Sequence, residues 1–263
     1  MKHIWRGFFK RKRDKVLVLS GWGFRWFYSI GVLKGLEECW IDKEIKAIFG
    51  VSIGAIIWSL WANEMPAEEI YKTLSSLSVG KFYGKDIFHK TWWFLSNKKI
   101  EALIQKHLPE RFRQLKKKLY VGVVDTNAAK YMLLEKWSLP DIVLWSMSIP
   151  GVFPPVEYKN YLLVDGGVLD NFPVDKAKRK YPKAKIIWVA LNKFEKNQKI
   201  KTVMDNIMVN FEIVLRSKLE EDTKKVDYLF YKKISIPILS LDKKKMKEAY
   251  EMGYKDCMKK FGK

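Results

Sequence analysis

The amino-acid sequence predicts an α/β protein, because short apolar runs typical of strands alternate with longer segments typical of helices. Residues 16–19 form an apolar run, which is followed by a glycine-bearing loop and by helical spacing of apolar residues over 27–38. Residues 46–49 form a second run, followed by a tight turn and by an apolar segment, 55–62, that is long enough for a buried helix. The first part of the chain therefore contains two strand–loop–helix units.

Length and charge limit the domain organisation and the partners. A chain of 263 residues, 48% of them hydrophobic, can bury a sizeable core. We expect residues 1–15 to form a basic N-terminal extension and residues 16–263 to form a single domain. The net charge of +21 favours anionic partners such as acidic phospholipid surfaces. No recognition motif accompanies the charge, so we expect no specific nucleic-acid partner.

The N-terminal region predicts neither a signal peptide nor a membrane span. Its apolar run stops after four residues at Ser20, and no window reaches the roughly 18 apolar residues of a spanning helix. Cys39 and Cys257 form no metal-ligand pattern, and weakly indicate a reducing compartment. We expect a cytoplasmic protein without metal or cofactor that can associate peripherally with anionic membranes. The anchor would be Lys10–Arg13, beside Trp5, Phe8 and Phe9, although a solvated chain end is the simpler explanation.

The residues from Gly50 to Gly54 have the Gly-x-Ser-x-Gly pattern of a nucleophile elbow. Glycines on both sides allow a strained backbone path, so that the hydroxyl of Ser52 stands clear at the start of a helix. A turn of small residues that only packs a helix against a sheet would look the same. Ser52 is therefore a candidate nucleophile that needs a base and an oxyanion site.

The loop after the first strand contains Gly21, Trp22, Gly23 and Arg25. A strand, a glycine-bearing loop and a helix bring several backbone N–H groups to the mouth of a sheet, where they can bind an anion or an oxyanion. A dinucleotide-binding loop would require glycine at position 26, which is tryptophan. We therefore favour an oxyanion hole, in which Ile53 follows the serine and supplies a further N–H.

The rest of the chain predicts further helices and strands. Apolar periodicity or composition indicates helices over 98–107, 111–118, 139–148 and 246–261, a helical pattern over 203–219, and strands over 120–125, 131–134, 161–164 and 185–190. The strand over 161–164 leads directly into Asp165, Gly166 and Gly167. This arrangement predicts a rigidly held carboxylate with open space beside it, although Asp-Gly is also common in plain turns.

The base for Ser52 could be a histidine or a carboxylate. In a hydrolase triad with the order Ser, Asp, His, the histidine would follow the acid, and no histidine follows Asp165. Only His89 or His107 could complete a triad with an earlier acid. A serine–aspartate dyad needs no histidine, because the carboxylate can accept the serine proton and return it to the leaving group.

These motifs together resemble the patatin-like phospholipase family. The resemblance rests on Gly21-x-Gly23-x-Arg25 with Gly31-Val32-Leu33, on the elbow with Ala55, on Ser148 to Pro155, and on Asp165-Gly166-Gly167 with Asn171-x-Pro173-Val174, all within residues 16–174. It implies a three-layer α/β/α sandwich with a mostly parallel sheet and hydrolysis of acyl esters of glycerolipids or phospholipids. It also implies Ser52 as nucleophile, Asp165 as base and the loop amides as oxyanion donors, with Arg25, Gly50, Gly54, Gly166 and Gly167 in supporting positions.

A second function remains open. Where the family has glycines, this chain carries Trp22 and Trp26, whose side chains restrict positive φ and crowd the loop. The alternative is therefore a weakly active or inactive homologue that binds lipid or a partner.

Overall fold

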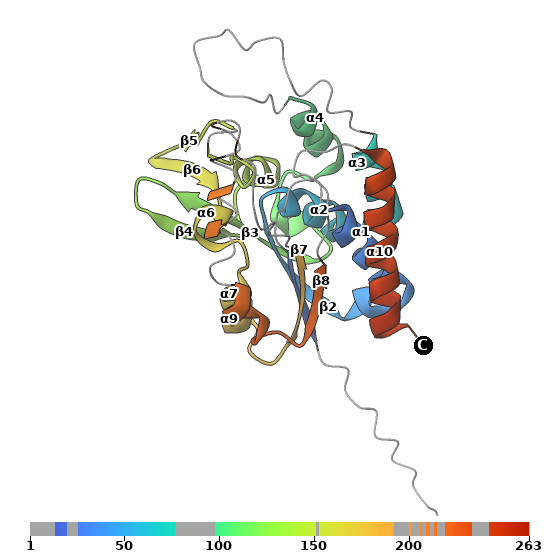
Figure 1. Ribbon diagram of the computed structural model, residues 1–263. Coiled ribbons are helices and arrows are strands. Elements are labelled where there is room, and N and C mark those ends of the chain that lie inside the picture. The colour runs from blue at the N-terminus through green and yellow to red at the C-terminus, as the bar shows by residue number, and fades with distance from the viewer. Residues whose placement is uncertain are drawn as a thin grey trace, which may run out of the picture.

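The computed structural model describes residues 14–19, 26–76, 98–150, 153–191, 219–232 and 242–262, together with single positions between 200 and 214 (Figure 1). Within these residues the fold is built on a mixed sheet of eight strands, in the order β5-β6-β3-β2-β1-β7-β8, with β4 paired to β3. The strands are β1 Lys15–Leu19, β2 Ile45–Val51, β3 Lys118–Asp125, β4 Lys130–Leu134, β5 Val156–Tyr158, β6 Tyr161–Asp165, β7 Lys185–Leu191 and β8 Tyr228–Lys232.

Most pairings between the described strands are parallel. β1 pairs in parallel with β2 and β7, β2 with β3, and β7 with β8, whereas β4, β5 and β6 enter through antiparallel pairings. The central strands β1, β2 and β3 are almost entirely buried, which explains why they are continuous apolar runs and do not alternate with polar residues.

Helices cover both faces of this sheet, as the three-layer prediction requires. Figure 1 shows α1, α2, α3 and α10 on one side and α7 and α9 on the other. The described helices are α1 Phe27–Glu38, α2 Ile53–Ala62, α3 Ala67–Ser75, α4 Lys98–His107, α5 Leu139–Trp145, α6 Gly167–Asp170, α7 Val174–Lys180, α9 Leu219–Thr223 and α10 Lys243–Phe261, with 3₁₀ turns η1 Ile41–Glu44 and η3 Phe112–Gln114. The fold class predicted from the motifs is confirmed.

The last helix, α10, packs against α1 with the two backbones in contact. A Cβ atom on Gly31 would overlap the carbonyl oxygen of Tyr250, and one on Gly253 would overlap that of Tyr28. Glycine at both positions therefore allows the helices to approach more closely than any side chain would permit. This contact joins the C-terminal end of the chain to the first helix after β1.

One predicted helix is wrong. Residues 111–118 were expected to be an amphipathic helix, but the structure has the short turn η3 followed by an extended connection into β3. The backbone N–H groups of Lys116 and Lys117 both donate to the carbonyl oxygen of Ala62 at the end of α2, at 3.0 and 3.1 Å. These bonds to another element replace helical hydrogen bonds, so the tertiary contact overrides the local pattern. The helical pattern over 203–219 lies largely outside the described residues.

Candidate active site

Ser52 lies in the tight turn between β2 and α2, as the elbow pattern predicts. Its backbone has φ 59° and ψ −141°, a conformation that costs a non-glycine residue about 1–3 kcal/mol. Gly50 allows the close return of the chain, because a Cβ atom there would lie 2.7 Å from Cδ1 of Trp58. Gly54 is buried in the first turn of α2. The serine is only 7% exposed, so the elbow holds its hydroxyl at a largely covered position.

A second serine, Ser146, holds the elbow in place. The backbone N–H of Ser52 donates to Oγ of Ser146 at 2.8 Å, and that hydroxyl donates to the carbonyl oxygen of Gly122 in β3 at 2.6 Å. All three residues come from different elements, and Ser146 is fully buried at the end of α5. Sequence reasoning missed this residue, because a serine two positions before the Ser148–Pro155 motif carries no signal of its own.

The pairing of β3 brings Asp165 close to Ser52. β4 occupies one edge of β3 along residues 121–125, so that β2 and β6 share the other edge. β2 runs up to Val51, which pairs with Gly122, and β6 runs in the opposite direction down to Asp165, which pairs with Val123. The carboxyl ends of the two strands therefore meet at adjacent residues of β3.

The carboxyl group of Asp165 is fully buried, and this burial dominates its electrostatics. Burial raises its pKa, while the hydroxyl of Ser52 and the backbone N–H of Gly167 lower it, and the result is a pKa of about 7. The Gly167 N–H donates to Oδ1 at 2.7 Å. Oδ2 has no hydrogen-bond partner within the described residues, so the interaction with Ser52 is weaker than a well-aligned hydrogen bond. Hydrogen bonds between catalytic groups are often long or poorly aligned in the absence of substrate and tighten in the complex.

Close packing requires the first of the two glycines after Asp165. A Cβ atom on Gly166 would lie 2.5 Å from the carbonyl oxygen of Gly122, the same oxygen that Ser146 binds. Gly167 starts α6 and is buried. Gly50, Asp165 and Gly166 thus all lie against one short stretch of β3, residues 121–123.

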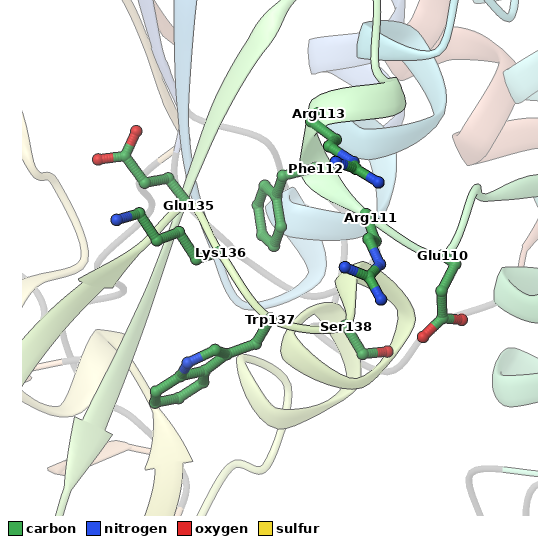
Figure 2. Close-up of a pocket in the computed structure, with 8 residues that line it drawn as sticks. All are labelled: Glu110, Arg111, Phe112, Arg113, Glu135, Lys136, Trp137 and Ser138. Carbon is green, nitrogen blue, oxygen red and sulfur yellow. The ribbon is translucent and has the colours of Figure 1, made fainter.

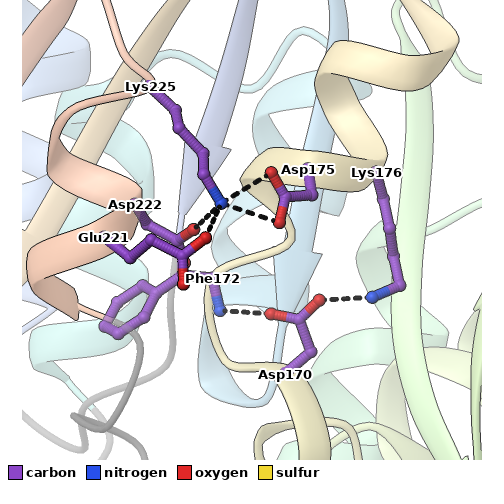
Figure 3. Close-up of polar contacts among 7 residues, drawn as sticks. All are labelled: Asp170, Phe172, Asp175, Lys176, Glu221, Asp222 and Lys225. Carbon is purple, nitrogen blue, oxygen red and sulfur yellow. Dashed lines mark hydrogen bonds and ion pairs between the residues drawn. The ribbon is translucent and has the colours of Figure 1, made fainter.

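Ion pairs fix the chain that follows the aspartate (Figure 3). Asp170 accepts the backbone N–H of Phe172 at 3.2 Å and forms an ion pair with Lys176 of α7. In the first turn of α7, Asp175 binds Lys225, which also binds Glu221 and Asp222 of α9. Segments before and after the undescribed region are thereby joined beside the site.

Several predicted site residues lie outside the described chain. These are Gly21, Trp22, Gly23 and Arg25 of the glycine-bearing loop, and His89, one of the two histidines considered for a triad. Ile53 is described and begins α2, where the first backbone N–H groups have no acceptor within the helix. His107 ends α4, and its described contact is a backbone one, from Nδ2 of Asn63 to its carbonyl oxygen at 3.1 Å.

Trp26, one of the two bulky residues that motivated the alternative function, is well accommodated. Its φ is −62°, so the position needs no glycine. The side chain is 3% exposed and stacks on Phe27 with ring centroids 4.3 Å apart. Trp26 therefore belongs to the core, and its size does not distort the start of α1.

An α/β sheet with a serine elbow and a buried aspartate at the neighbouring strand end defines the class of this protein. A family model described as patatin-like phospholipase matches residues 17–178, and the chain belongs to this family. It is 31% identical over 204 residues to "Probable lipid hydrolase 463L" of Invertebrate iridescent virus 6, covering 68% of this chain and 70% of that protein. It is 27% identical over 274 residues to "Lysophospholipase NTE1" of Candida albicans, covering 91% of this chain but only 19% of that protein.

A solved structure has the same fold. The structure of VipD from Legionella pneumophila matches with a TM-score of 0.63 at 14% identity, over 95% of this chain and 66% of that one. Among the helices that the structure describes, none has the length and apolar character needed to cross a bilayer.

Proposed function

We propose that this protein is a lipid acyl hydrolase that cleaves acyl esters of glycerolipids or phospholipids through an acyl-serine intermediate. The observation that supports this most directly is the position of Ser52, on a strained elbow, against the buried carboxyl group of Asp165. Family membership and the names of the viral and yeast relatives support a lipid ester as the substrate.

In the first half of the reaction, Oγ of Ser52 attacks the ester carbonyl carbon while the ionised carboxylate of Asp165 accepts the hydroxyl proton. The carboxyl group then returns this proton to the leaving alcohol. Because the base must be ionised and its pKa is about 7, activity rises as the pH increases through neutrality.

In the second half, water attacks the acyl carbon of the acyl-serine and gives one proton to Asp165. The bond from that carbon to Oγ of Ser52 then breaks, Asp165 returns the proton to Oγ, and the fatty acid is released. The negative charge on the carbonyl oxygen develops in both halves. The N–H of Ile53, at the start of α2, and the amides of Gly21, Trp22 and Gly23 are the proposed donors to that oxygen. The helix N-terminus adds a favourable field for the same charge.

One of the two observations behind the non-catalytic alternative no longer supports it, because Trp26 packs in the core without backbone strain. Trp22 lies outside the described residues, so the alternative stays open and the labelling experiment below tests it.

The anionic partner that we propose is a phospholipid bilayer, which the net charge of +21 attracts from solution. Lys10–Arg13, the part of the basic extension that was expected to anchor the protein, also lies outside the described residues.

Labelling with a fluorophosphonate tests the proposed function. We expect a covalent adduct on Ser52 in the wild-type protein and no adduct in Ser52→Ala. Ser59→Ala is the matched control, because Ser59 is a buried serine of α2 whose hydroxyl donates only within its own helix, to Ile56. Labelling that persists in Ser52→Ala, or its absence from the wild-type protein, would contradict the assignment.

Ser146→Ala is expected to lower kcat by about tenfold and to destabilise the fold by about 2 kcal/mol. The variant leaves the buried N–H of Ser52 and the carbonyl of Gly122 without their partner, and each orphaned group costs about 1–3 kcal/mol. Steady-state kinetics and urea denaturation measure the two effects, with Ser59→Ala again as control. Equal kcat in both variants would show that Ser146 does not position the elbow.

A further inference from the structure

A surface pocket lies between the η3 turn and the connection from β4 to α5. Figure 2 shows Arg111 and Arg113 on one wall and Glu135, Lys136 and Trp137 on the other. Its volume is about 390 Å³. Arg111 and Ser138 form a backbone bridge, and the N–H of Leu139 donates to the carbonyl oxygen of Glu110 at 2.9 Å. Both walls are therefore held by backbone hydrogen bonds, so the pocket is preformed.

The free charges around this pocket are mainly positive. Arg111 and Arg113 are exposed, and within the described chain neither has an ion pair. Glu135 is already bound by Lys118 at 2.7 Å and by Lys180 at 3.2 Å, which lower the pKa of its carboxyl group against the effect of burial. Lys136 is exposed as well, and Glu110 supplies an opposing charge. Two guanidinium groups are thus available for a ligand, and guanidinium forks match phosphate oxygens well.

An aromatic cluster continues from the pocket to the hairpin of β5 and β6. The ring of Trp137 lies 5.1 Å from that of Tyr158, 5.9 Å from that of Tyr161 and 6.2 Å from that of Trp145. Trp137 has a φ of 77°, a strained value that the surrounding contacts maintain. Lys159, at the hairpin turn, places its ammonium group 5.3 Å from the ring centre of Tyr158.

We propose that this basic–aromatic surface, made of Arg111, Arg113, Lys136, Trp137, Tyr158, Lys159 and Tyr161, docks on an anionic bilayer and holds a lipid phosphate in the pocket between the two arginines. Half-buried Trp and Tyr with adjacent Lys and Arg have the chemistry of the lipid interface, where rings lie among the head groups and cations bind phosphate. The exposed acids nearby, Glu110 and Glu157, are fewer than the basic groups.

The surface is connected to the candidate active site. α5 runs from Ser138 at the pocket to Ser146, which binds the backbone of Ser52. The seven residues of this helix span about 10 Å at 1.5 Å per residue. The proposed docking surface is therefore separated from the residue that holds the elbow by the length of one short helix. This inference rests on the proposed function for its choice of a lipid ligand, although the surface itself is independent of Ser52.

Binding to vesicles tests the proposal without any reaction. Vesicles of ether-linked phosphatidylglycerol and phosphatidylcholine contain no acyl ester, so a failure of the proposed hydrolase activity cannot affect the result. We expect the double variant Arg111→Gln with Arg113→Gln to weaken vesicle binding by about 30-fold. This corresponds to a loss of about 1 kcal/mol of binding free energy for each of the two basic groups near the surface. The matched control is Lys178→Gln with Arg179→Gln, two exposed residues of α7 that carry the same charge. It is expected to weaken binding less than threefold.

Three results would overturn the proposal. Equal losses in the two double variants would indicate diffuse charge attraction. Unchanged binding in the arginine variant would remove the pocket as a docking site. Saturable binding of glycerol 3-phosphate that depends on both arginines, without vesicle binding, would assign the pocket to a soluble phosphate ligand. Lys136→Gln, which removes another exposed charge of the surface, is expected to weaken binding about fivefold and gives an independent measurement if the arginine variant unfolds.

Discussion

Asp165→Asn is expected to reduce hydrolysis of a short-chain ester on the order of 10⁴-fold, as severely as Ser52→Ala, while removal of all histidines leaves the activity within a few-fold of wild type. Asparagine keeps the shape of the side chain but cannot accept the serine proton, and loss of the base or of the nucleophile disables the same step. The measurement is kcat/KM at pH 8, where the wild-type carboxyl group is ionised.

The histidine variant carries His3→Gln, His89→Gln and His107→Gln, which are the three histidines of the chain. A folded triple variant that is as inactive as Ser52→Ala would rule out the dyad in favour of a triad. Combining Ser52→Ala with Asp165→Asn provides a further control, because two members of one catalytic unit lose little more together than alone. Additive losses would show that the two residues act separately.

Asp165→Asn is also expected to stabilise the protein at pH 8, by about 2–4 kcal/mol. Burial raises the pKa of this carboxyl group from 3.8 to about 7 in the folded protein. Between these two values the folded state binds more protons than the unfolded state, so the free energy of unfolding falls as the pH rises through this window. The full penalty applies above pH 7, and it amounts to about 1.4 kcal/mol for each pH unit that separates the two pKa values. The asparagine does not titrate, and its oxygen can still accept the N–H of Gly167.

Urea denaturation at pH 5 and pH 8 measures this effect. The stability difference between Asp165→Asn and wild type should grow by about 2–3 kcal/mol from the lower to the higher pH, because most of the wild-type penalty appears between them. Asp141→Asn, a change at an exposed aspartate of α5, should show a constant difference. A constant difference for Asp165→Asn as well would mean that its carboxyl group is ionised in the folded protein already at pH 5. Together with the kinetics, the result would show a catalytic group that is held at a cost in stability.

Local patterns predicted the elements that carry the site. The apolar runs of β1 and β2 and the glycines around Ser52 were recognisable, because a buried strand followed by a tight turn leaves a strong local signal. Residues 111–118 misled the prediction, since their helical spacing was real but their N–H groups bind Ala62. The strands β5 and β8 were not predicted. They have three and five residues and lie at the edges of the sheet, where forming a strand depends on pairing with the neighbouring strand more than on the local sequence.

The sequence by itself determined the elbow at Ser52, the carboxylate at Asp165 and the alternation of strands and helices, because each depends on residues within a few positions of one another. Only the tertiary structure decided that these two residues meet. β6 runs antiparallel to β3 and pairs with it along the same edge as β2, beginning where the pairing with β2 ends at Gly122. The carboxyl ends of β2 and β6 therefore lie together, although Ser52 and Asp165 are 113 positions apart in the sequence. The same packing decided the role of Ser146, whose hydroxyl joins Ser52 to Gly122. No local pattern contains this information, because strand pairing is set by which buried surfaces fit together over the whole sheet.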